Sequence, residues 1–245
     1  MSSYNVVKSL KDEGLLRSIK LVDVSNDLGV ITELGLLSVP AISKDGKILG
    51  IDPLEPDFVK ALLTGDEVTI EKYVPKSYSE ALDRFSASLI HSSYASILAL
   101  IHNSIDPLLN TRFIDHAVRL ELVSSLSKDK LIEEIKLRSR DIFESLRDKM
   151  VRVAAKNYLR EVVWILGIDI DELTLKKYID RDLITQWLLA KASVGRVLVP
   201  YNFNIVKDVA THVVNVLTNK LSKYLKDLIE EYRTLMREFI HRELE

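Results

Sequence analysis

The sequence predicts a mainly helical protein with a small α+β domain at its N-terminus, and three observations support this prediction. Six of the eight glycines and four of the six prolines lie in the first 75 residues. Beyond them the sequence shows long amphipathic patterns typical of helices. The chain has no cysteine, which excludes disulfides, thiolate metal sites and a cysteine nucleophile. The shift in turn-forming residues predicts two domains, residues 1–75 and 76–245.

The first domain is expected to begin with alternating helix and strand. Apolar residues at helical spacing predict a helix over residues 4–16. The β-rich run at 19–24 predicts a short strand. A second helix is predicted over 27–34, since Gly35 can end it.

A β-hairpin and a closing helix complete the predicted first domain. Asp45-Gly46 supplies the positive φ angles that a tight turn needs, so residues 38–42 and 47–51 are predicted to pair. Pro56 and Gly65 are typical of a helix start and a residue just past a helix end, and they predict a helix over 56–63. The predicted order of elements is therefore α-β-α-β-β-α.

The second domain is predicted to be all-helical, with about six helices and a long helix at its C-terminus. These helices are expected at residues 78–103, 107–126, 128–166, 170–179, 181–193 and 204–243. Residues 194–204 contain Pro200 and two asparagines, and they predict an apolar loop.

The predicted C-terminal helix carries a seven-residue repeat of apolar side chains. Its members are Val214, Leu221, Leu228 and Leu235, interleaved with Leu225, Tyr232 and Phe239. Such a seam packs against another helix. It can pack on the 128–166 helix of the same chain, or on a second chain as a coiled coil. The seam and the short sheet of the first domain together predict a homodimer.

Residues 19–65 resemble the C-terminal part of a thioredoxin-like domain, the fold of glutaredoxin-like proteins and of the N-terminal domain of glutathione transferases. The similar stretches are Val22-Asp-Val24, Glu33-Leu-Gly35, Ser38-Val-Pro-Ala-Ile42 and Asp45-Gly-Lys-Ile-Leu-Gly50. The resemblance implies a cis peptide before Pro40. It also implies that the main chain of Val39 hydrogen-bonds a ligand, so Val39 and Pro40 are the expected ligand-binding residues.

This chain departs from the thioredoxin-like pattern in ways that affect its chemistry. Redox members carry a Cys-x-x-Cys pair at the start of the first helix, whereas this chain begins almost at that helix and has no cysteine. Thiol–disulfide exchange is therefore excluded. Glutathione transferases use a serine or tyrosine hydroxyl at this place, so the resemblance implies Ser3 or Tyr4 as catalytic residues; the alternative is a frayed helix start. The acidic-Ser pair that holds glutathione in that family is absent from Ile51-Asp-Pro-Leu-Glu55.

A row of basic residues follows one face of the predicted 128–166 helix. Its members, spaced by three and four, are Lys149, Arg152, Lys156 and Arg160. Such a face can bind nucleic acid or an acidic protein. The alternative is a solvated face paired with acidic residues of a neighbouring helix. No aromatic residues interleave with it as a base-stacking platform requires, apart from Tyr158.

We expect the sequence to contain no membrane span, no metal site and no secretory leader. The charge-free stretch from Phe85 to Ile105 holds six serines, which predicts a buried helix of a cytoplasmic protein. Glu238-Phe-Ile-His241 has the spacing of a di-metal helix but occurs once. The single glutamine, Gln186, and a charged fraction of 29% are typical of thermophiles.

The sequence thus predicts a non-catalytic binding or scaffold protein that needs no cofactor. In this interpretation a thioredoxin-like module without redox residues is joined to a helical assembly domain that binds a second copy or another protein. The first alternative is a glutathione-transferase-like enzyme, for which glutathione is the expected ligand. The second is a nucleic-acid-binding protein that uses the basic helix face. The net charge of −2 at pH 7 means that such binding depends on a local patch.

Overall fold

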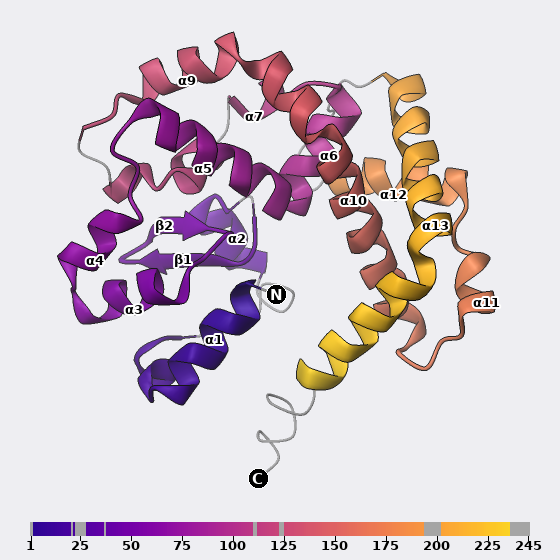
Figure 1. The fold of residues 1–245 in the computed structure, drawn as a ribbon, viewed down its shortest axis with the longest axis horizontal. Helices are drawn as coiled ribbons and strands as arrows, with labels where there is room; N and C mark the ends of the chain where they lie inside the picture. Colours follow the sequence, from indigo (N-terminus) through magenta and orange to yellow (C-terminus); the bar gives the residue numbers. More distant parts are fainter. Residues whose placement is uncertain are drawn as a thin grey trace. The chain divides into compact units, whose positions relative to one another are not determined.

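The computed structural model describes residues 2–20, 22, 28–36, 38–109, 112–122, 125–193 and 202–235. Over these ranges the protein is mainly helical, with a small antiparallel sheet of two strands (Figure 1). The chain forms two compact units: unit 1 is residues 1–95 with 105–144, and unit 2 is residues 96–104 with 145–245. None of the helices in the described ranges combines the length and apolar character that a membrane span requires.

These two units do not follow the predicted boundary at residues 75 and 76. Unit 1 also contains α5 (Tyr78–His91) and α8 (Phe113–Ala117). The physical reason is packing, because α8 lies against strand β2 (Lys47–Ile51) and the ring of Phe113 meets that of Phe85 edge-on at 5.9 Å. Turn-forming residues mark where the local sequence pattern changes, whereas these side-chain contacts determine which segments share a core.

The first helices of unit 1 resemble the predicted ones, whereas the first predicted strand is not seen. Helix α1 spans Ser2–Asp12, the 3-10 turn η1 spans Leu15–Ser18, and α2 spans Leu28–Leu34. Within the run 19–24, residues 19, 20 and 22 lie in no strand, and residues 21, 23 and 24 lie outside the described ranges. Helical backbone continues to Ser18 in η1, so the chain is not extended when it enters this run.

The predicted β-hairpin is confirmed, although its first strand begins at Ala41 and not at residue 38. Strand β1 (Ala41–Lys44) pairs antiparallel with β2, and Lys44 faces Lys47 across the turn. Asp45 and Gly46 have φ angles of 52° and 76°, the left-handed pair that a two-residue hairpin turn uses. Both peptides that precede the prolines beside the hairpin, Val39–Pro40 and Asp52–Pro53, are cis.

Helix α3 (Pro56–Thr64) closes the core of unit 1, as predicted, and α4 (Glu67–Lys72) follows without having been predicted. Gly65 ends α3 in the left-handed conformation, with φ of 73°. Asp66 then starts α4, because its carboxylate accepts hydrogen bonds from the N–H of Thr69 at 3.1 Å and from its hydroxyl at 2.7 Å. Such N-caps stabilise short helices by about 1 kcal/mol.

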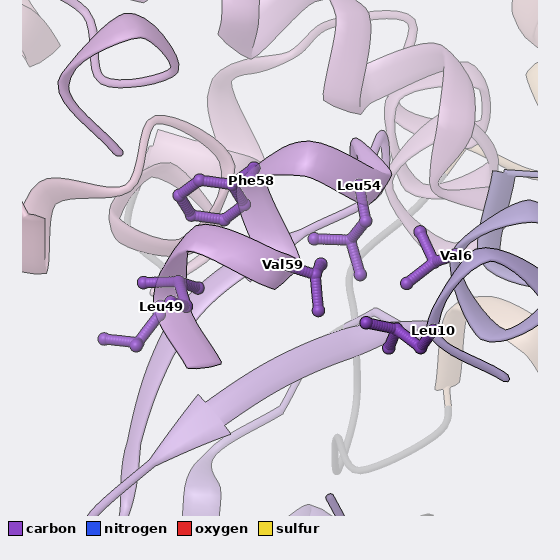
Figure 2. Packing of buried hydrophobic residues seen from close by; sticks show 7 residues of the cluster. Val6, Leu10, Leu49, Leu54, Phe58 and Val59 are labelled. Carbon is purple, nitrogen blue, oxygen red and sulfur yellow. The ribbon is translucent and has the colours of Figure 1, made fainter. Parts of the chain in front are cut away.

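Apolar side chains from α1, from β2 and the loop after it, and from α3 form the core of unit 1 (Figure 2). They are Val6, Leu10, Leu49, Leu54, Phe58, Val59 and Leu62. Leu10 and Phe58 are fully buried, and each such side chain stabilises the fold by about 1.5–3 kcal/mol. This core holds α1 and the hairpin on α3.

The predicted helices at 78–103 and 107–126 are each broken in the structure. The first is divided into α5 and α6 (Ser93–His102) at Ser92, whose backbone is extended and whose hydroxyl accepts the N–H of Ala95 at 3.2 Å. The second is divided into α7 (Asp106–Leu109), α8 and the 3-10 turn η2 (Leu120–Leu122). Arg119 lies between α8 and η2 with φ of 59°, a value that no α-helix accommodates.

The predicted 128–166 helix is also broken, into α9 (Lys128–Leu137) and α10 (Ser139–Leu166). Arg138 separates them with φ of −110° and ψ of 7°. The remaining helices of unit 2 are α11 (Glu172–Lys176), α12 (Arg181–Ser193) and α13 (Phe203–Leu235). Most of the predicted loop at 194–204, and the predicted helix beyond Leu235, lie outside the described residues.

Helix α13 packs along α12 and also contacts α11 in unit 2 (Figure 1). Its buried side chains are Val206, Val209, Ala210, Val213, Leu217, Leu221, Tyr224 and Leu225. Among the seam positions, Leu221 and Leu225 are buried, whereas Val214, Leu228 and Tyr232 are half-buried. The Leu235 side chain and Phe239 lie outside the described part. Burial thus decreases toward the end of α13.

Candidate functional site

Three ionisable side chains that the sequence analysis did not single out meet in unit 1. Glu55 lies just before α3, Arg84 is on α5, and Arg119 is the left-handed residue between α8 and η2. Arg119 Nη2 donates to Glu55 Oε2 at 2.5 Å, and Arg84 Nη1 donates to Glu55 Oε1 at 3.3 Å. The Arg119 side chain is fully buried, and 30% of the Glu55 side chain is exposed. We call these three residues the Glu55 cluster.

Arg119 also connects the cluster to the backbone and to the apolar core. Its Nη1 donates to the Tyr73 carbonyl at 3.2 Å, and its Nη2 donates to the Pro53 carbonyl at 3.3 Å. The guanidinium carbon lies 3.5 Å from the centre of the Phe58 ring, which is within the range of a cation–π interaction. These contacts hold a non-glycine residue in the left-handed region, which costs on the order of 1 kcal/mol or more.

The electrostatics of the Glu55 cluster favour a structural role. Burial alone would raise the pKa of Glu55, but Arg119 and Arg84 outweigh it and hold the pKa below its usual value. Burial, together with the charge of Arg84, lowers the pKa of Arg119 to about 10, although Glu55 opposes the fall. Neither value is near 7, where a general acid or base works best. Through these ion pairs, Glu55 in the loop after β2 binds Arg84 on α5 and Arg119 between α8 and η2.

Gly50 leaves the space through which the Arg119 side chain passes over β2. A Cβ at position 50 would lie 3.1 Å from Arg119 Nε, and the hydrogen bonds of Arg119 prevent it from moving aside. We expect Gly50→Ala to destabilise the protein by about 1–2 kcal/mol, since overpacking outweighs the entropic gain of losing a glycine. Urea unfolding checks this prediction. The loss of stability caused by Gly50→Ala should be smaller in an Arg119→Met background. An equal loss in the unmodified and the Arg119→Met backgrounds would contradict the clash with Arg119.

His116 is a buried histidine of α8, with an Nδ1 that has no hydrogen-bond partner in the described structure. Burial lowers its pKa. Asp115 and Glu121 oppose this shift, while Arg112 and Lys128 add to it. The neutral imidazole is therefore the form that the folded protein favours.

The burial of His116 predicts a pH-dependent stability. Its pKa is lower in the folded state than in the unfolded chain, so its stabilising contribution is present above the unfolded pKa of about 6.5 and is lost as pH falls. The free energy of unfolding should decrease between pH 7 and pH 5, and His116→Gln should remove most of this decrease. Urea titrations at both pH values measure it. The exposed His91 is the control, and an equal pH dependence in His116→Gln and His91→Gln would contradict the prediction.

The predicted ligand-binding residues Val39 and Pro40 lie beside the start of β1. Val39 is 53% exposed. The Pro40 carbonyl is used within the fold, because it accepts the N–H of Asp52 at 3.3 Å. The backbone of Ser3 and Tyr4 lies in the first turn of α1, and their side chains lie outside the described part.

The basic row on α10 is exposed, as predicted, but half of it is engaged by α13. Arg160 Nη2 donates to Glu231 at 3.0 Å. The Lys156 ammonium lies 5.1 Å from the centre of the Tyr224 ring. Lys149 and Arg152 are exposed on the same helix. Two of the four members therefore contact α13, and the other two are exposed on α10.

The last turn of α10 exposes three apolar residues in succession. Trp164, Ile165 and Leu166 are 72%, 78% and 39% exposed. The Trp164 ring meets the ring of Tyr232 on α13 nearly edge-on, with 6.0 Å between their centres. Large contiguous apolar surface is uncommon on monomeric proteins and marks interaction sites. The sequence analysis placed these residues inside a helix and did not consider their exposure.

No group of three metal-ligating side chains occurs among the described residues, and Glu238 and His241 lie beyond them. The chain matches no protein-family model, no curated protein and no solved structure. The resemblance to thioredoxin-like domains therefore rests on the residues of this chain alone. One signal in the sequence could have pointed to the Glu55 cluster, since Arg119 is a single charge within the apolar run Ala117-Val-Arg-Leu120.

Proposed function

We propose that this chain is a non-catalytic binding or scaffold protein. Its N-terminal part acts as a thioredoxin-like module without redox residues, and its helical part mediates assembly. The observation that carries the proposal is the exposed apolar turn Trp164-Ile165-Leu166 at the end of α10. Exposing a large apolar side chain forgoes about 1.5–3 kcal/mol of burial free energy, which a partner can recover.

The charged groups of unit 1 support the same proposal. Glu55, Arg84 and Arg119 hydrogen-bond one another, and Arg119 also bonds two carbonyls of the chain. Glu55 has both carboxylate oxygens engaged, so it is poorly placed to bind a substrate as well. Catalysis needs groups that are free to act on a substrate, whereas the side chains of this cluster already bond one another and the backbone.

Calorimetric titration of the full chain with glutathione tests the proposal. We expect no heat of binding up to millimolar glutathione, because the chain lacks the acidic-Ser pair that holds this ligand in glutathione transferases. A micromolar affinity would overturn the proposal. A thermal-shift titration with the same ligand checks the result independently, since ligand binding raises the melting temperature.

A glutathione-transferase-like enzyme is the second candidate, and the exposure of Val39 favours it. An accessible main chain at this position can hydrogen-bond an extended ligand such as glutathione. This candidate predicts a titration with micromolar affinity. It also predicts that Ser3→Ala or Tyr4→Phe abolishes conjugation of glutathione to an electrophile. No turnover by the unmodified chain would remove this candidate.

A further inference from the structure

We propose that a second copy of this chain docks on the exposed end of α10 and the adjacent part of α13. We call this region the α10–α13 surface and define it by Trp164, Ile165, Leu228 and Tyr232. The inference deepens the proposed function and rests on it, because it names both the surface and the partner of the assembly. The partner follows from three features of unit 2: the order of its helix contacts, the length of its apolar seam, and the charges beside that seam.

Side chains of α10 and α13 contact one another at three places along the two helices. Their side-chain contacts run in the same order along both helices: Lys156 with Tyr224, Arg160 with Glu231, and Trp164 with Tyr232. Helix α10 ends at Leu166, only two residues after the last of these contacts. The Trp164–Tyr232 pair therefore lies near the C-terminal end of α10.

Burial along the apolar seam of α13 decreases toward this point. Leu221 and Leu225 are buried, whereas Leu228 and Tyr232 are only half-buried. In the sequence the seven-residue repeat goes on to Leu235 and Phe239, and residues 236–245 follow the described part of the helix. A repeat of this kind packs on another helix. Leu228 and Tyr232 therefore keep apolar surface that is not covered by the described part of the chain.

The residue types at this surface favour a second copy. An apolar seven-residue repeat is complementary to itself, so one copy can meet another about a two-fold axis in which both contribute the same patch. Trp164 and Tyr232 are of the types that are enriched at the centres of protein interfaces. The charges beside the seam have both signs: Lys226, Asp227, Glu230 and Arg233. An oppositely charged partner is therefore not required.

Sedimentation equilibrium of the full chain tests the proposal directly. The unmodified chain should show about twice its mass of 27.9 kDa. The double variant Trp164→Lys/Ile165→Lys should raise the dimer dissociation constant at least tenfold, because it places two charges in the interface. Both side chains are more than 70% exposed, so the fold should persist, and circular dichroism verifies this. Ile165→Lys alone is the milder variant and should weaken the dimer in the same direction.

Val68→Lys is the matched control, because Val68 is an equally exposed apolar residue, at 71%, on α4 of unit 1. It should leave the dissociation constant unchanged. The proposal is overturned if the unmodified chain has the mass of one copy at all concentrations. It is also overturned if the double variant dimerises as tightly as the unmodified chain.

Acrylamide quenching of Trp164 fluorescence in a Trp187→Phe background distinguishes a second copy from the chain's own C-terminal residues. Shielding by a second copy must increase with protein concentration. Shielding that is independent of concentration would assign the surface to residues 236–245 and overturn the inference. A different experiment tests the proposed function. Glutathione binding would overturn that function, whereas the measured masses and quenching curves test only the α10–α13 surface as a dimer interface.

Discussion

Replacing Arg119 by methionine is expected to destabilise the protein by about 3–5 kcal/mol, the range found when one partner of a buried ion pair is removed. Methionine fills part of the space but cannot donate to Glu55, Tyr73 or Pro53, all of which accept from Arg119. Their oxygen atoms would then lose hydrogen bonds inside unit 1. The cation–π contact with Phe58 is lost as well.

Hydrogen exchange of the amides in the hairpin and α3, followed by mass spectrometry, measures this loss in unit 1 alone. Urea unfolding followed by circular dichroism gives the effect on the whole chain. Lys47→Met is the control, because Lys47 pairs with Glu121 on the surface at 2.9 Å, and exposed pairs contribute little. Equal protection of the hairpin amides in Arg119→Met and Lys47→Met would contradict the role assigned to the Glu55 cluster.

Phe58→Ala is expected to cost about 3–5 kcal/mol, the usual loss for a fully buried phenylalanine. Its ring is completely buried, with the guanidinium carbon of Arg119 at 3.5 Å from the ring centre and the centre of the Tyr73 ring 5.9 Å away. Alanine would leave a cavity in the core that joins α1, β2 and α3. It would also remove the aromatic face on which Arg119 rests.

Phe203→Ala is the matched control for this core substitution. Phe203 is 48% exposed at the start of α13, where its ring lies 4.8 Å from the Lys207 ammonium. Its loss should be well below that of Phe58→Ala, because much of its surface already contacts water. Urea unfolding compares the two variants. Equal losses would mean that the core in Figure 2 does not stabilise unit 1 as described.

The sequence predicted elements whose signals are local. The hairpin turn depends on Asp45-Gly46 and α3 depends on Pro56 and Gly65, and both elements appear close to the expected places. Helix breaks without a proline were missed. Ser92 and Arg138 are ordinary residues within helical patterns. The break at Ser92 carries a capping contact, and the break at Arg138 is a change of backbone conformation that no residue type signals.

The sequence analysis missed the Glu55 cluster because its members are far apart in the chain, although Arg119 stands out as a single charge in an apolar run. Glu55, Arg84 and Arg119 come from three segments, and the packing of α8 on β2 and of α5 on α8 brings them together. The sequence placed the basic row on one face of a helix, and its four members are exposed on α10. Its engagement by Glu231 and Tyr224 depends on how α13 packs, and a helical pattern alone does not report that.

The central claim of this account is that the protein acts by binding through apolar surface. Sedimentation equilibrium of the unmodified chain in low salt and in about 1 M salt tests it most directly, since the Debye length falls to about 3 Å at that ionic strength. Apolar contacts persist there, whereas contacts made by the basic row would weaken. The account predicts a mass of two copies in both buffers. A single-copy mass in both, or a dimer that dissociates in high salt, would contradict it.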